Sequence, residues 1–262
     1  HRKFFNQLIS SQLDVDRLDY LRRDSFFTGV TEGNIGSARI IKMLDLRDDK
    51  LVVEAKGIYS IENFLMARRL MYWQVYLHKT AVAAEKMLIK TFKRAKELSM
   101  KGEKLFASPS LQFFLEKNVD KTFFDTDRSE VLRHFVNLDD NDIWCSLKVW
   151  TSHRDKVLST LSRSLIDRKL FKIEISADPK SLEDISAKVK LYMDTLGVNE
   201  YEASYFYSSD IITSNMYNEV DDSIDILYND GTIKDISSAS DMLNIELLSK
   251  KVDKYYFSYL RI

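Results

Sequence analysis

The sequence predicts a mainly α-helical protein, with a helical body over residues 1–168 and a small α+β module over residues 169–262. Only 7 glycines and 2 prolines occur in 262 residues, and these are the residues that most often interrupt helices. From residue 5 to about residue 165 the apolar residues recur at helical spacing, whereas strand-like runs flank one helix beyond residue 168. Long helices are therefore expected first, and most strands near the C-terminus.

The helical body is expected to begin with one helix over residues 5–24. It ends before a loop at 26–39 that holds three of the seven glycines. A β-hairpin follows, with strands at 39–49 and 50–57 and a turn at Asp48, Asp49 and Lys50.

A second, longer helix is expected to start at Ser60 and Asn63 and to extend over residues 61–102, ending at Gly102. Shorter helices complete the body, at 108–118, 125–138, 139–152 and 153–170. The α+β module is expected to contain strands at 171–176 and 205–212, a helix at 179–197, a hairpin at 222–237 with an Asn-Asp-Gly turn, and a closing strand at 254–262.

Bulk composition argues against several classes of partner. The formal net charge of -1 provides no overall field that would attract nucleic acid or a membrane, so neither is expected as a partner. The single cysteine, Cys145, excludes an internal disulfide and any cysteine-based metal cluster. The sequence contains no apolar run long enough to span a bilayer, and its first residues do not resemble a signal peptide. We therefore expect a cytoplasmic location.

The stretch QLDVDRLDYLRRD, residues 12–24, carries many opposed charges on one predicted helix. At 100° per residue, Asp16, Tyr20 and Asp24 lie within about 80° of one another, with Arg17 at the border of that sector. Asp14 lies roughly 200° from Asp16, so in a regular helix it points away from this face. The two carboxylates therefore cannot serve the same ligand, and one of them is spare.

Two interpretations of this helix remain open. It can be a solvated face stabilised by pairs such as Asp16 with Arg23 and Asp19 with Arg22, each contributing about 0.2–0.5 kcal/mol. It can also line a pocket, with a carboxylate for a metal, a guanidinium for phosphate, and a phenol with a carboxylate for hydroxyl groups.

The long helix repeats the mixture of cations and phenols. Arg68, Tyr72, Tyr76 and Lys79 lie within about 80° on one face, which suits a ligand with phosphates at one end and a sugar at the other. A stripe of helical tyrosines more often belongs to a hydrophobic core, but a fully buried face rarely contains two cations.

A resemblance to a known family bears on both helices. LISSQLDVDRLDYLRRDSFFTGVTEGN and the later ARRLMYWQVYLHK resemble, in order and spacing, the HD-domain phosphohydrolases of the deoxynucleoside triphosphate triphosphohydrolase type. LDDNDIWCSLKVW and LIDRKLFK extend the similarity more weakly, so that it covers most of the chain. It implies an HD-domain-like helical body and hydrolysis of a deoxynucleotide to nucleoside and tripolyphosphate. The implied cofactor is a divalent metal: Mn, Mg, Fe, Zn or Ni.

The resemblance also implies roles for individual residues. Asp16 corresponds to the family's last metal ligand, so that Asp14 is the spare carboxylate. Arg17 and Arg68 correspond to phosphate-binding cations, with Asp16 and Arg17 as the catalytic pair. The expected substrate-binding residues are Arg17, Tyr20, Asp24, Arg68, Tyr72 and Tyr76. Relatives in this family are often activated by nucleotides that bind between the subunits of a homo-oligomer. By that analogy, the residues expected to contact a regulatory nucleotide are His78, Lys79, Arg168 and Lys172.

The family's His-Asp doublet is absent from this sequence. The histidines are His1, His78, His134 and His153, and none precedes an aspartate; His1 is expected to be an ordinary loop residue. We therefore expect the chain to be a fragment that lacks the upstream His and His-Asp ligands, inactive alone, with an uncovered hydrophobic face. One alternative is a nucleotide-binding sensor or interaction protein without catalysis, and another is hydrolysis of a different phosphate ester.

Overall fold

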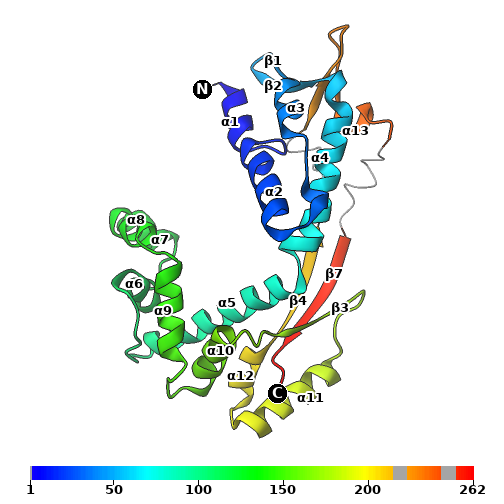
Figure 1. The fold of residues 1–262 in the computed structure, drawn as a ribbon. Coiled ribbons are helices and arrows are strands. Elements are labelled where there is room, and N and C mark those ends of the chain that lie inside the picture. Colours follow the sequence, from blue (N-terminus) through cyan, green and yellow to red (C-terminus); the bar gives the residue numbers. More distant parts are fainter. Residues whose placement is uncertain (1, 215–222, 243–251) are drawn as a thin grey trace. The chain divides into compact units, whose positions relative to one another are not determined.

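The computed structural model describes residues 2–214, 223–242 and 252–262, and its fold is mainly α with an α+β part toward the C-terminus, as predicted (Figure 1). The expected loop role of His1 and the first residue of the predicted hairpin at 222–237 lie outside these residues. The chain divides into two compact units. Unit 1 comprises residues 1–78 and 213–253, and unit 2 comprises residues 79–212 and 254–262.

Unit 1 packs helices against a small mixed sheet. Its elements are α1 (Lys3–Ile9), α2 (Val15–Thr28), α3 (Ser37–Lys42), β1 (Leu44–Arg47), β2 (Lys50–Glu54), α4 (Ile58–Met71), β5 (Asp225–Leu227), β6 (Ile233–Asp235) and α13 (Ile236–Ala239). The strand order is β1-β2-β5-β6, with β2 parallel to β5 and the other neighbours antiparallel. Its core joins apolar residues of α2 and α4, including Leu21 and Phe64, to Ile226 of β5.

The first predicted helix is wrong in two respects: the structure breaks it into α1 and α2 at residues 10–14, and α2 continues to Thr28, past the predicted end at residue 24. Asp14 is the N-cap of α2: its Oδ1 accepts a hydrogen bond of 2.7 Å from the backbone N–H of Arg17. An aspartate at this position satisfies an N–H group that has no partner within the helix. The helix therefore starts afresh at Val15.

The second predicted helix is also interrupted. α4 ends at Met71, a π-helical turn η3 (Tyr72–Tyr76) follows, and α5 (Lys79–Met100) begins after His78. The backbone N–H of Leu77 donates to the carbonyl of Tyr72, 2.7 Å away, which is the wider hydrogen bond of a π-turn. No glycine or proline marks this position, so helix-breaker signals could not have located it.

The predicted N-terminal hairpin is confirmed but shorter. Asp48 and Asp49 form its turn with φ of 49° and 61°, a left-handed conformation that aspartate tolerates better than most residues. Residues 39–42, expected within the first strand, belong to α3 (Ser37–Lys42) instead. The predicted hairpin near residue 230 is present as β5 and β6, but it joins the sheet of β1 and β2.

Unit 2 contains most of the remaining helices and a second sheet. Its elements are α5, α6 (Pro109–Glu116), α7 (Lys121–Thr126), α8 (Arg128–Val136), α9 (Asp140–Trp150), α10 (Lys156–Ile166), β3 (Lys172–Ser176), α11 (Leu182–Leu196), α12 (Glu200–Ala203), and most of β4 (Tyr207–Ser214) and of β7 (Val252–Tyr259). The sheet order is β3-β7-β4, and β3 and β7 pair antiparallel with Ile173 opposite Ser258. The predicted strands at 171–176 and 254–262 are thus confirmed, and the structure pairs them with each other.

The division of the chain differs from the boundary expected at residue 168. α5 to α10 pack with β3 and α12 in unit 2, while β5 and β6 complete the sheet of unit 1. The expected boundary was placed where the helical spacing of apolar residues gives way to strand-like runs. The units instead follow pairings between distant segments, which local patterns do not specify.

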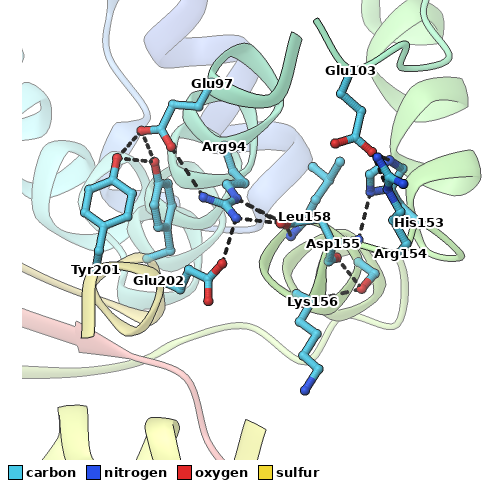
Figure 2. A network of polar contacts seen from close by, with 12 residues as sticks. Arg94, Glu97, Glu103, His153, Arg154, Asp155, Lys156, Leu158, Tyr201 and Glu202 are labelled. Carbon is cyan, nitrogen blue, oxygen red and sulfur yellow. Dashed lines mark hydrogen bonds and ion pairs between the residues drawn. The ribbon is translucent and has the colours of Figure 1, made fainter. Parts of the chain in front are cut away.

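A buried ion network links α5, α10 and α12 inside unit 2 (Figure 2). Arg94 of α5, whose side chain is 6% exposed, contacts Asp155 at 2.5 Å and Glu202 at 3.0 Å. Glu97, one turn further along α5, accepts hydrogen bonds from Tyr201 and Tyr205. Asp155 also N-caps α10 through the N–H of Leu158, so the network fixes the start of that helix.

Among the helices that the structure describes, none is long and apolar enough to cross a membrane.

Candidate functional site

In unit 1, side chains of α2 and η3 form a cluster of aromatic and polar groups. The Tyr76 hydroxyl donates a hydrogen bond of 2.7 Å to Oδ2 of Asp24, across 52 positions of the chain. The ring of Tyr20 packs edge-on against that of Tyr76, with centroids 5.8 Å apart, and the Tyr72 ring lies 6.3 Å from Tyr76. Four residues predicted from two separate helix faces are therefore neighbours.

The π-turn places these tyrosines. In a regular α-helix, Tyr72 and Tyr76 would follow α4 without interruption, whereas a π-turn inserts extra backbone and shifts the side chains that follow it. Gln74, in the same turn, donates to Glu32 at 3.2 Å and so ties η3 to the segment after α2. The irregular backbone lies at the part of the chain that carries the predicted ligand contacts.

Two arginines lie beside the tyrosines. Burial, followed by the positive charge of Arg17, lowers the pKa of Arg68, and burial raises the pKa of Tyr20 although both arginines oppose that shift. Within the described part of the chain, Nε of Arg17 and Nη1 of Arg68 are buried without a hydrogen-bond partner. Buried donors without partners are costly, so this pair of cations is suited to a multivalent anion that supplies acceptors.

Asp14 differs from its sequence-based interpretation. We expected it to point away from the site, but its residue is 4% exposed and its carboxylate caps α2 and contacts Nη1 of Arg17. The angular argument failed because it extended a regular helix through residues 10–14, where the backbone is not helical. The N-cap role could have been predicted, since an aspartate directly before an apolar-periodic run is a start signal for a helix.

Asp16, the predicted metal ligand, is exposed in the first turn of α2, one turn before Tyr20. The described residues contain no group of three or more His, Cys, Asp or Glu side chains that could hold a metal ion. A single carboxylate does not bind a divalent transition metal tightly. The donors in these residues therefore do not by themselves fit a metal centre.

A second candidate site lies entirely within unit 2. A cavity of about 670 Å³ is lined by Lys79, Thr80, Arg168, Lys169, Leu170, Phe171, Lys172, Ile173 and Arg261. Five of these residues are cationic and none is acidic, so the cavity is suited to an anion with several charges. Arg168 has a φ of 56°, an unusual backbone conformation for a non-glycine residue at the corner between α10 and β3.

This cavity contains some of the predicted regulatory residues and adds others. Lys79, Arg168 and Lys172 line it, whereas His78 is exposed in unit 1 and is not part of the lining. Lys169 and Arg261 were not predicted. The adjacent Arg168-Lys169 pair was a local signal for the former, but the position of Arg261 depends on β7, which pairs with β3 from the far end of the chain.

Comparison with known proteins indicates the class. Residues 35–109, which include α4, η3 and all of α5, match the family described as the HD associated region. A solved structure of a phosphohydrolase from Bacteroides thetaiotaomicron superimposes with a TM-score of 0.93 and 62% sequence identity, covering 99% of this chain and 64% of that one. These matches support an HD-type phosphohydrolase at this coarse level. HD phosphohydrolases generally use divalent metals.

Two relatives of known sequence add detail. The uncharacterised protein YwfO of Bacillus subtilis is 35% identical over 184 residues, covering 70% of this chain and 40% of that protein. The deoxynucleoside triphosphate triphosphohydrolase SAMHD1 homolog of Dictyostelium discoideum is 28% identical over 97 residues, covering 36% of this chain and 19% of that protein. The chain thus spans well under half the length of these relatives.

Proposed function

We propose that the protein to which this chain belongs hydrolyses deoxynucleoside triphosphates to nucleoside and tripolyphosphate. One observation carries the proposal: two arginines with unpartnered buried N–H groups lie beside a tyrosine–aspartate cluster. The two arginines are suited to binding a polyphosphate, and the tyrosine–aspartate cluster is suited to binding a sugar through its hydroxyl groups. The similarity over 97 residues to a SAMHD1 homolog supports a deoxynucleotide as the substrate.

Each residue has a defined part in this proposal. Arg17 and Arg68 bind the phosphates and neutralise the negative charge that develops as the phosphate ester breaks. Asp24 accepts a hydrogen bond from a sugar hydroxyl, and Tyr20 orients the sugar beside it. Tyr76 packs on the deoxyribose, where a ribose 2′-hydroxyl would collide with its ring.

The divalent metal expected for this class is Mn, Mg, Fe, Zn or Ni, and Asp16 is the one ligand we assign to it in this chain. Its remaining ligands come from outside the described residues in this proposal. The donors among the described residues of this chain do not complete a site for the metal on their own.

The cationic cavity of unit 2 is proposed to bind a nucleotide activator through its phosphates. Lys79, Arg168, Lys169 and Lys172 contribute most of its charge. We further propose that the protein forms a homo-oligomer. Phe26 and Phe27, at the end of α2, are 80% and 78% exposed in the chain, and such apolar side chains favour burial against another surface.

Hydrolysis is tested on the full-length protein with each of the four deoxynucleoside triphosphates and, separately, the ribonucleotides, with release of tripolyphosphate as the readout. We expect metal-dependent turnover of deoxynucleotides and a loss on the order of 10²–10³ in rate for Arg68→Ala. Arg22→Ala, which removes an exposed arginine of α2, is the control and should retain full activity.

The other outcomes identify the alternatives. Nucleotide binding by calorimetry without turnover would select a sensor over an enzyme. Release of phosphate from esters other than deoxynucleoside triphosphates would select a different phosphohydrolase specificity. Equal turnover of ribonucleotides and deoxynucleotides would contradict the role assigned to Tyr76.

A further inference from the structure

We propose that Asp14 is a positioning residue, which holds the Arg17 guanidinium in the orientation that a bound phosphate needs. This inference rests on the proposed function, because it specifies how one phosphate-binding group of that site is kept in place. The sequence-based interpretation of Asp14 was different: of the two carboxylates Asp14 and Asp16, Asp14 was expected to take no part in the site.

The two oxygens of Asp14 make different contacts. Oδ1 accepts from the backbone N–H of Arg17 at 2.7 Å and so caps α2, while Oδ2 contacts Nη1 of the Arg17 side chain. The same Nη1 also donates to the carbonyl of Ser11, in the turn before the helix. One residue is thus held by Asp14 at both its backbone and its side chain.

Capping alone does not require a carboxylate. Serine and asparagine cap helices about as well as aspartate, and both avoid the cost of burying a charge. The Asp14 side chain is only 5% exposed, so a carboxylate stands where burial of a charge is costly. The partner that compensates for the buried charge is the Arg17 guanidinium, whose side chain is 27% exposed.

The geometry of a guanidinium explains the consequence. Its atoms are coplanar, so fixing Nη1 between Asp14 and Ser11 restricts the directions in which the other N–H groups point. Nε of Arg17 is buried and has no acceptor among the described residues, so this donor stays unsatisfied until an acceptor reaches it. Asp14 therefore acts on a ligand through Arg17 without contacting the ligand.

Asp14 also offsets repulsion between cations. The charge of Arg17 opposes the charged state of Arg68, and the charge of Asp14 favours it. Without the carboxylate, two neighbouring guanidinium groups would repel each other when no anion is bound. The carboxylate keeps both arginines close together before the anion arrives, and an arrangement formed in advance lowers the ordering cost of binding.

Asp14→Asn in the full-length protein separates the two roles, because asparagine keeps the capping oxygen and loses the charge. We expect kcat/KM for deoxynucleotides to fall 10-fold to 100-fold. The decisive measurement is a double-mutant cycle with Arg17→Ala. If Asp14 acts through Arg17, Asp14→Asn has no further effect on kcat/KM in the Arg17→Ala background. If it lowers kcat/KM equally in both backgrounds, the proposal is overturned.

The matched control is Asp19→Asn, which neutralises the exposed partner of Arg23 on the same helix and should leave kcat/KM unchanged. A second readout does not depend on the reaction: the NMR signal of the Arg17 Nε–Hε group. In wild type its exchange with solvent should be slowed, and Asp14→Asn should accelerate it at least 10-fold. Unaltered exchange overturns the inference even in an active enzyme. If exchange is accelerated but the protein does not hydrolyse deoxynucleotides, the positioning role of Asp14 is supported and only the proposed function is refuted.

Discussion

Replacing Arg94 with methionine leaves buried carboxylates in unit 2 without the guanidinium that pairs with them. The Arg94 side chain is 6% exposed and that of Asp155 is 11% exposed, so water can solvate neither well. Removing one partner of a buried ion pair typically costs about 3–5 kcal/mol, because the other charge stays buried and uncompensated. At roughly 2–4 °C per kcal/mol, the melting temperature should fall by about 6–20 °C.

The assay is thermal unfolding of the chain followed by circular dichroism, with a urea titration to obtain the free energy of unfolding. Arg154→Met is the matched control, because Arg154 also pairs with a carboxylate, Glu103 at 2.8 Å, but is 82% exposed. Exposed ion pairs contribute little, so this variant should melt almost as wild type does.

A rescue variant isolates the cause. Adding Asp155→Asn to Arg94→Met removes one uncompensated charge but keeps an oxygen that can cap α10, so part of the lost stability should return. Two results would refute the reasoning: an Arg94→Met protein within about 1 kcal/mol of wild type, or a double variant that is no more stable than Arg94→Met.

Four further outcomes are expected. Asp14→Ala should destabilise the chain by about 1–2 kcal/mol in urea unfolding, and Asp14→Asn by less, since only alanine removes the cap. Burial alone raises the pKa of Asp155, but hydrogen bonds from Arg94 and from the Leu158 amide lower it overall. Its contribution to stability is therefore complete above the usual pKa of 3.8 and should be lost as pH falls further. In an acid titration, the free energy of unfolding should fall less steeply with decreasing pH in Asp155→Asn than in wild type. Tyr76→Phe should raise KM for deoxynucleotides, because its hydrogen bond to Asp24 is lost, while the melting temperature changes by only a few degrees. Arg168→Glu should weaken the binding of tripolyphosphate to the chain, measured by calorimetry, and should make the affinity less dependent on salt concentration. An unchanged affinity would exclude the cationic cavity as the binding site.

Helix boundaries that depend on local chemistry were the most predictable part of the fold. Asp139 caps α9 at the predicted start of the helix over 139–152, and Gly197 ends α11 in a left-handed conformation at the predicted end of the helix over 179–197. Each of these signals acts between residues a few positions apart. The start of α2 obeys the same rule at Asp14, and it was missed only because helical periodicity was extended across the break.

The site was predictable where the helix is regular. From Val15 onward α2 keeps its period, so Tyr20 and Asp24 do share a face, and both contact Tyr76. The catalytic and binding roles of these residues stay predictions. The sequence contains no helix-breaker signal at the π-turn, and the place of Arg261 in the cationic cavity depends on the pairing of β7 with β3, for which a single sequence contains no local signal.

The parallel pairing of β2 with β5 has a consequence for biosynthesis. Val53 lies opposite Ile226, which a ribosome adds roughly ten to thirty seconds later at about 5–20 residues per second. During synthesis of α5 to α12, the first 78 residues therefore lack the strand β5, and one edge of β2 stays unpaired. Contacts of such long sequence separation form slowly, and unpaired strand edges promote aggregation. We expect newly made chains to be most vulnerable to aggregation in this interval, before the last strands of unit 1 emerge.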